Sequence, residues 1–152
     1  TTRTPLFIHA PGFSKDGAKT RQPATLTDLY PTLCELAGLP TPKQCTGRSL
    51  AAQVKNPAKV DARASLTSYV FRGTEPAHGI SDTRYRYIHY PDGFEELYDL
   101  ENDRNEFKNL AGDPAHAETM ARMKKFVPNQ IAADVGPATE SPYHRSRTRR
   151  AE

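Results

Sequence analysis

The chain has 152 residues, 36% of them hydrophobic and 13 of them proline, and its 21 Lys and Arg exceed its 18 Asp and Glu by three. This size fits one ordinary domain, or a small domain with part of another, and the composition indicates a loop-rich protein with a modest core. Seven Tyr and six Phe argue against wholesale disorder, and no run approaches the about 18–20 apolar residues of a membrane span.

The first predicted element is a short strand. The apolar run Thr4–His9 ends at Ala10-Pro11-Gly12, a length and a stop that favour a buried strand. Such a strand needs neighbours on both sides, and the chain offers few nearby. We therefore expect its sheet partners to lie elsewhere.

A helix is predicted within Thr25–Gly38. Asp28 is the expected N-cap, Gly38 suits the left-handed position after the last turn, and Pro40 prevents continuation. The apolar residues expected on one face are Leu29, Leu33, Leu36 and Ala37. After a loop, Gly47–Leu50 is expected to lead into one short helical turn that ends near Val54.

Four strands with short connections follow. They are predicted at Ala64–Arg72, His78–Asp82, Tyr85–Tyr90 and Glu95–Leu100, from β-forming residues, alternation and the turn Pro91-Asp92-Gly93. Consecutive strands joined in this way predict an antiparallel meander.

A second helix is predicted over Pro114–Val127, with Asp113 as its N-cap. Its apolar residues would cover one face of the meander; they are Ala117, Met120, Ala121, Met123 and Phe126. From Ala133 onward we expect little order. The end of the chain is rich in arginine, which is typical of a solvated terminus or of a salt-sensitive contact with a polyanion.

The two cysteines, Cys34 and Cys45, do not form a metal-binding pattern. A single disulfide between them and a buried free thiol at Cys34 both remain open. The acidic run Asp99, Glu101, Asp103 and Glu106 lacks the central Gly and terminal Glu of an EF-hand. We therefore predict no metal site in this chain.

Several segments resemble the C-terminal part of sulfatases in their order and spacing, and they most resemble iduronate-2-sulfatase-like members. The segments are Pro5–Ile8 with Pro11-Gly12, Leu26–Leu33 running on to Leu36–Pro40, Gly47–Leu50, Arg84–Ile88, Glu96–Leu100, and Asn102-Asp103 with Glu106 and Asn109–Ala111. The resemblance covers roughly residues 4–133.

The resemblance implies an alkaline-phosphatase-like α/β fold, present here in part. Residues 1–60 would end the large α/β domain, with Pro5–Ile8 as a strand of its central sheet. Residues 61–133 would form a small C-terminal subdomain, an antiparallel meander with a packed helix, and residues 134–152 a disordered basic tail. The expected partner is the N-terminal catalytic part of the same protein.

Members of this family carry a Cys/Ser-x-Pro/Ala-x-Arg motif that is modified to formylglycine, beside a calcium ion held by acidic and amide side chains. Such chemistry needs a strong nucleophile next to a hard cation. Neither Cys34 nor Cys45 has Pro and Arg at the required offsets. The resemblance therefore implies that calcium and formylglycine belong to the parent enzyme, and we predict that this chain alone is inactive and has no catalytic residue.

Three residues are candidates for binding substrate. His78 is either a loop histidine in solvent or a contact to a sugar or sulfate, since histidine can donate to an anion. Arg72 and Lys43 are weaker candidates of the same kind. Arg84 and Arg86 either pair with acidic residues across the hairpin or line a basic groove for a sulfated glycan.

The function expected from the resemblance is hydrolysis of sulfate esters, on sulfated carbohydrate, by a periplasmic or extracellular parent. A different ester hydrolase of the same superfamily, acting on phosphonates or phosphates, is the first alternative. A non-catalytic module that binds polyanions through its basic tail is the second. No nucleic-acid partner is predicted. The chain begins at Thr1 rather than Met, so the lack of a signal peptide says nothing about location.

Overall fold

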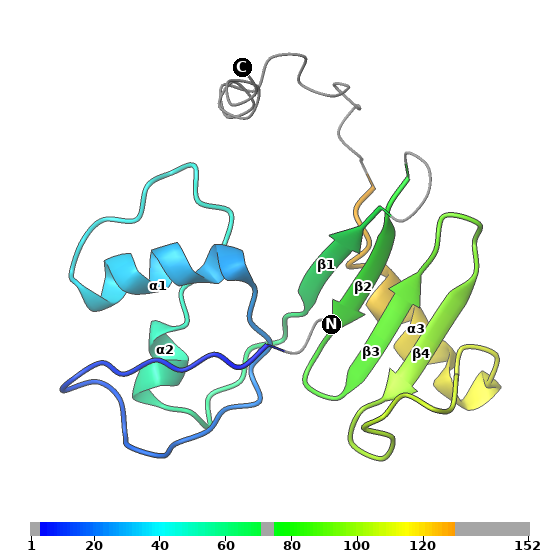
Figure 1. The fold of residues 1–152 in the computed structure, drawn as a ribbon, viewed down its shortest axis with the longest axis horizontal. Helices are drawn as coiled ribbons and strands as arrows, with labels where there is room; N and C mark the ends of the chain where they lie inside the picture. The colour runs from blue at the N-terminus through cyan, green and yellow to red at the C-terminus, as the bar shows by residue number, and fades with distance from the viewer. Residues whose placement is uncertain (1–3, 71–74, 130–152) are drawn as a thin grey trace, which may run out of the picture.

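The computed structural model describes residues 4–70 and 75–129 (Figure 1). Two short helices and long connections form one half of the molecule, and a sheet with a helix behind it forms the other. Residues 4–9 run as extended chain without a strand partner, and Phe7 is 91% exposed. The strand predicted at Thr4–His9 is therefore wrong for this chain, because no strand within residues 4–70 and 75–129 lies beside it to accept its backbone hydrogen bonds.

The N-terminal half contains three helical segments: η1 (Leu26–Asp28), α1 (Leu29–Leu36) and α2 (Ala51–Lys55). Helix α1 ends as its sequence predicts. Gly38 adopts a positive φ of 69°, and the Leu39 N–H donates to the Cys34 carbonyl at 2.8 Å. The predicted short turn before Val54 is also confirmed as α2.

Helix α1 buries three of its smaller residues, leaves Leu29 and Leu36 half-buried and exposes its other large side chains. Pro31, Thr32 and Cys34 are buried, whereas Tyr30 is 57% and Leu33 62% exposed. Leu26 in η1, at 85%, continues the exposed row at helical spacing. We call Leu26, Tyr30 and Leu33 the apolar stripe. The expectation that Leu33 lies on a buried face is wrong within this chain.

The four predicted strands form a sheet in the order β1-β2-β3-β4, all antiparallel. Their bounds are Ser65–Tyr69, Ala77–Ser81, Tyr85–His89 and Glu95–Asp99. In the register, Ile80 lies opposite Tyr87 and Tyr87 opposite Leu97, so three fully buried side chains share one face. The meander is therefore confirmed.

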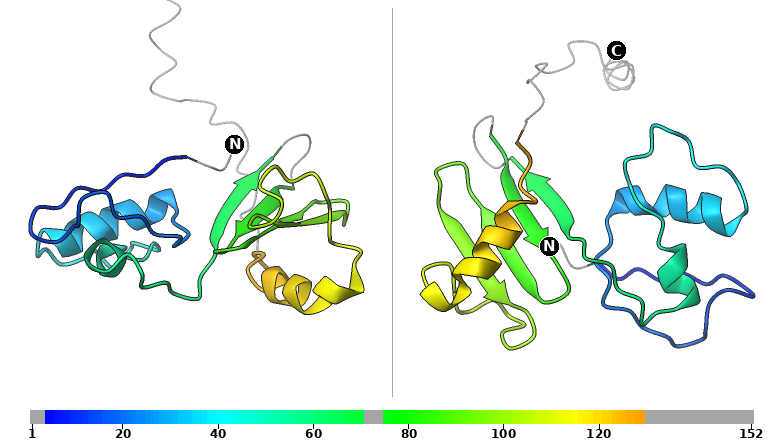
Figure 2. Two further views of the ribbon diagram at one scale, coloured as in Figure 1. Left: turned by 90° about the horizontal axis from the view of Figure 1, so that it is seen from below. Right: turned by 180° about the vertical axis from the view of Figure 1, so that it is seen from behind.

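Helix α3 (Ala117–Lys124), preceded by η2 (Pro114–His116), covers this face (Figure 2). The Asp113 carboxylate accepts the Ala115 N–H at 2.9 Å, as an N-cap should. Met120 and Met123 complete the core of Ile80, Tyr87 and Leu97. The apolar face predicted for this helix is confirmed at these two methionines, whereas Phe126 is 38% exposed.

Cys34 and Cys45 are both free, so the possible disulfide is absent. Within residues 4–70 and 75–129, no helix is both long and apolar enough to cross a membrane. The arginine-rich tail lies outside the described residues.

Candidate functional site

His78 lies in strand β2 rather than in a solvated loop, and it is only 5% exposed. Its Nδ1 is 2.9 Å from the Ser68 Oγ, and His89 is its cross-strand neighbour. Burial lowers the pKa of His78, and the charge on nearby His89 lowers it further. Of the two alternatives for His78, the solvent-exposed loop position is therefore wrong. A contact to substrate remains a prediction.

A polar group adjoins His78 on the helix-covered face. The Tyr87 hydroxyl donates a short hydrogen bond to Glu95, whose other oxygen lies 2.9 Å from Lys124 Nζ on α3. Burial alone would raise the pKa of Glu95, but the hydrogen bonds from Tyr87 and Lys124 outweigh it and lower that pKa. The same burial raises the pKa of Tyr87. The group ties α3 to β3 and β4.

The other two candidates do not join His78. Lys43 is exposed in the loop between α1 and α2, in the opposite half of the molecule from β2 (Figure 1). Arg72 lies outside the described residues. The structure therefore does not gather His78 and Lys43 into one site.

Arg84 and Arg86 are both engaged by acids. Arg84 binds Asp99 across the hairpin in a two-point contact of 3.0 and 2.7 Å, which holds the pKa of Asp99 well below its usual range. Arg86 donates to Glu106 at 2.7 Å and to the Ser81 hydroxyl at 3.1 Å. Cross-hairpin pairing is confirmed for Arg84 only, since the partner of Arg86 comes from the following loop.

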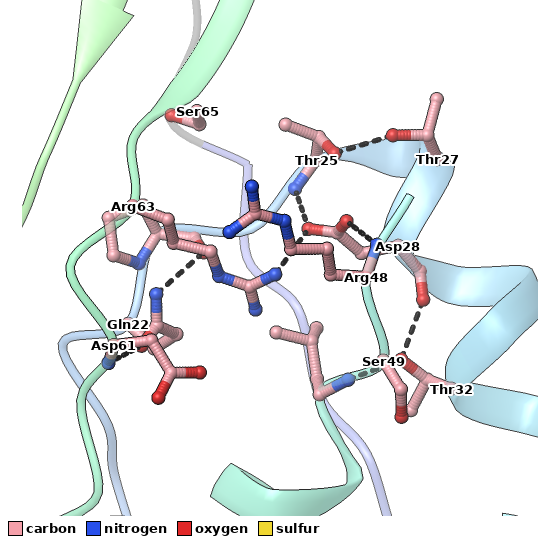
Figure 3. A network of polar contacts seen from close by, with 12 residues as sticks. Gln22, Thr25, Thr27, Asp28, Thr32, Arg48, Ser49, Asp61, Arg63 and Ser65 are labelled. Atoms are coloured by element: carbon pink, nitrogen blue, oxygen red, sulfur yellow. Dashed lines mark hydrogen bonds and ion pairs between the residues drawn. The ribbon is translucent and has the colours of Figure 1, made fainter. Parts of the chain in front are cut away.

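A buried polar network centred on Asp28 joins two segments that are far apart in sequence (Figure 3). One carboxylate oxygen of Asp28 accepts the Thr25 N–H at 2.9 Å, and the other accepts the Arg48 N–H at 2.8 Å. Thr32 repeats the pattern, because its hydroxyl donates to the Asp28 carbonyl and accepts the Leu50 N–H. Asp28 therefore does not cap the residues after it. Its side chain reaches back by three residues and forward by twenty.

Gly47 packs directly against this network. A Cβ added at Gly47 would lie 2.0 Å from the Thr27 carbonyl oxygen and 2.7 Å from the Asp28 nitrogen. Only a residue without a side chain allows this approach, which brings the Arg48 N–H within reach of Asp28. The sequence shows Gly47 and Asp28 as separate motifs and gives no signal of their contact.

Arg63 enters the network from the linker before β1, and its residue is 8% exposed. Its Nη1 lies 3.7 Å from an Asp28 oxygen, beyond ordinary hydrogen-bond distance. Its Nε and Nη2 have no hydrogen-bond partner in the described part of the chain. A buried guanidinium thus keeps two unused donors.

A pocket of about 200 Å³ lies beside these residues. Its polar wall contains Thr25, Thr27, Thr46, Arg48 and Arg63 with Asp28, and its apolar wall contains Ala62, Ala64, Leu66 and Phe126. No group of three or more His, Cys, Asp or Glu in residues 4–70 and 75–129 is arranged to hold a metal ion. The donor set around the pocket is cationic and hydroxylic, which does not fit calcium.

The family model of N-sulphoglucosamine sulphohydrolase, C-terminal, matches residues 1–133. The chain belongs to the sulfatases. It is 34% identical over 140 residues to a Δ4,5-hexuronate-2-O-sulfatase of Bacteroides thetaiotaomicron, a match that covers 86% of this chain and 28% of that protein. A sulfatase of Formosa agariphila is 32% identical over 131 residues, covering 86% and 25%. This sulfatase chain therefore spans about a quarter of the length of these relatives.

Solved structures also align with this chain. A protein solved in complex with its substrate D-glucosamine-2-N,6-O-disulfate aligns with a TM-score of 0.55 at 27% identity, over 64% of this chain and 22% of that one. A phosphonate monoester hydrolase of Silicibacter pomeroyi aligns with a TM-score of 0.59 at 28% identity, over 77% and 26%. The alkaline-phosphatase-like fold expected from the sequence is thus confirmed for the part of it present here.

The Asp28 network joins two of the segments that resemble sulfatases. Leu26–Leu33 supplies the carboxylate and the Thr32 hydroxyl, and Gly47–Leu50 supplies the two backbone N–H groups that they accept. The motifs are therefore the two sides of one contact.

Proposed function

We propose that the protein to which this chain belongs hydrolyses sulfate esters of acidic carbohydrate. The match of residues 1–133 to a sulfatase C-terminal family carries the proposal, and the hexuronate-2-O-sulfatase relative supports the substrate class. The chain's own part is to complete the α/β domain and to form one wall of the substrate cleft.

The catalytic group lies in another part of the protein, because no cysteine or serine here stands in a Cys/Ser-x-Pro/Ala-x-Arg motif. In the family, a formylglycine and a calcium ion supply the nucleophile and the positive charge that a sulfate ester requires. We place both in that other part, and we expect the 152-residue chain alone to be inactive. By the same resemblance, the parent is exported to the periplasm or the medium.

The partner that completes the domain is the catalytic part itself. The apolar stripe (Leu26, Tyr30, Leu33) and the extended residues 4–9 are the surfaces that such a partner would cover, since isolated exposed strands and helix faces leave apolar and backbone groups in water. Leu33→Lys should prevent the complete protein from assembling in soluble form. Leu39→Lys, at a similar 61% exposure but in the following loop, is the matched control.

Lys43 is exposed to solvent, and we propose that it contacts the sulfated carbohydrate. Lys43→Gln should raise KM for a sulfated disaccharide and leave kcat unchanged, as expected for binding that is equal in ground and transition states. An unchanged KM would remove Lys43 from the substrate cleft.

Phosphonate or phosphate ester hydrolysis is the second candidate, favoured by the alignment with the phosphonate monoester hydrolase. The reading frame upstream of Thr1 tests the sulfatase proposal and its alternatives. We expect an in-frame Cys/Ser-x-Pro/Ala-x-Arg motif followed by acidic residues. A stop codon and a start signal just before Thr1 would contradict the proposal and leave a polyanion-binding module as the better account.

A further inference from the structure

The pocket beside Asp28 has a wall with excess positive charge. Two guanidinium groups, those of Arg48 and Arg63, line it together with a single carboxylate, that of Asp28. Both oxygens of that carboxylate already accept backbone N–H groups, and its distance to Arg63 is 3.7 Å. Asp28 therefore forms one long ion pair with Arg63 and none with the Arg48 side chain, which leaves an excess of positive charge at the pocket.

Each arginine retains donors. Arg63 is more than nine-tenths buried, and its Nε and Nη2 have no partner within residues 4–70 and 75–129. The Arg48 side chain is exposed, and across the same residues it makes no hydrogen bond or ion pair. Figure 3 shows the Arg48 guanidinium extending toward that of Arg63 beside Asp28. Like charges brought to one pocket favour an anion between them.

The remaining polar groups suit an oxyanion. Thr25, Thr27 and Thr46 line the same wall. The Thr25 and Thr27 hydroxyls share a hydrogen bond of 2.7 Å, so one of these two and the Thr46 hydroxyl keep a donor for an oxygen. Leu66 and Phe126 close the other side with apolar surface, which a sugar ring can contact. A cation would meet two arginines here, and a purely apolar ligand would leave the guanidinium groups unpaired.

We propose that this pocket binds one oxyanion, the sulfate or carboxylate group of an acidic carbohydrate, at a place other than the ester that is hydrolysed. The choice of carbohydrate rests on the proposed function, whereas the binding of the oxyanion rests on the arginines alone. The Arg63 Nε and Nη2 are buried, so binding requires the Arg63 guanidinium to turn these donors into the pocket.

Titration of the isotopically labelled 152-residue chain, followed by NMR at constant ionic strength, tests the site. The probes are sodium sulfate, N-acetylglucosamine 6-sulfate and neutral N-acetylglucosamine, with sodium chloride as the balancing salt. We expect saturable shifts of the Thr27, Gly47 and Arg48 amides with both sulfates and none with the neutral sugar. Tighter binding of the sugar sulfate than of free sulfate identifies carbohydrate as the source, and weaker binding overturns that part.

Arg48→Gln removes a guanidinium whose side chain holds no described part of the fold, because Asp28 accepts only the Arg48 backbone N–H. It should weaken sulfate binding at least tenfold. Lys108→Gln removes the same charge from an exposed loop and should leave binding unchanged. Equal weakening by both variants, or shifts that do not saturate, would overturn the site.

These outcomes are separate from the proposed activity. A chain that binds sulfate here in a protein without sulfatase activity would refute the function and keep the site. Sulfatase activity in a protein that binds no sulfate at Arg48 would keep the proposed function and refute the site.

Discussion

Replacing Asp28 by alanine removes the acceptor on which the N-terminal half depends. The variant leaves the N–H groups of Thr25 and Arg48 without their partner and the buried Arg63 without a counter-charge. Hydrogen bonds to a charged group contribute about 1.5–3 kcal/mol each, and a buried charge deprived of its partner costs about 3–5 kcal/mol. These terms overlap, so we expect a loss of about 4 kcal/mol in the free energy of unfolding.

Urea denaturation of the 152-residue chain measures this loss. With an m-value of about 2 kcal/mol per M, the midpoint should fall by about 2 M. Asp92→Ala is the matched control, because Asp92 also accepts a backbone N–H, from Phe94 at 3.0 Å, but in an exposed turn. Equal shifts in the two variants would refute the argument that burial and the Arg48 and Arg63 contacts make Asp28 special.

Three further predictions concern packing and pH. Gly47→Ala should lower the free energy of unfolding by about 1–3 kcal/mol, because its Cβ would overlap the Thr27 carbonyl, whereas Gly112→Ala, with open space around it, should not. Met123→Ala should lower the free energy of unfolding, measured by thermal denaturation, by about 2–5 kcal/mol, since Met123 is fully buried in the core. Because the folded-state pKa of His78 is lowered, its neutral form stabilises the fold above the ordinary histidine pKa, about 6.5. Stability should therefore fall as the pH drops below that value, and His78→Gln should flatten this dependence.

The sheet and its helix follow from local sequence. Alternating apolar residues in Tyr85–Tyr90, the Pro91-Asp92-Gly93 turn and the Asp113-Pro114 start each act over a few residues, so strand and helix positions could be predicted to within a few residues. The pairing of Arg84 with Asp99 was predictable for the same reason, because the hairpin places Asp99 opposite Tyr85, the residue next to Arg84.

The Asp28 network could not be predicted in this way. Asp28 next to a helical run is a good local N-cap, and only the tertiary contact with Gly47 and Arg48, twenty residues on, redirects its carboxylate. Arg63 gave no signal, since nothing in its sequence surroundings indicates burial. The predicted strand His78–Asp82 lies one residue from the observed β2, but the burial of His78 at that end of the sheet could not be predicted from the neighbouring sequence.

In the apolar stripe and in residues 4–9, residues that the sequence predicts to be buried are exposed in the structure. The sequence pattern predicts burial, and the chain exposes Leu33 and Phe7. The pattern is explained if the surface that buries them belongs to the remaining three quarters of the relatives' length.

The most direct test of the proposed function is the activity of the complete protein, expressed from its full reading frame, on p-nitrophenyl sulfate and on a p-nitrophenyl phosphonate monoester. We expect kcat/KM for the sulfate ester to exceed that for the phosphonate, with no hydrolysis of either by the 152-residue chain alone. A preference for the phosphonate, or no sulfate release from the complete protein, would contradict assignment as a sulfate ester hydrolase.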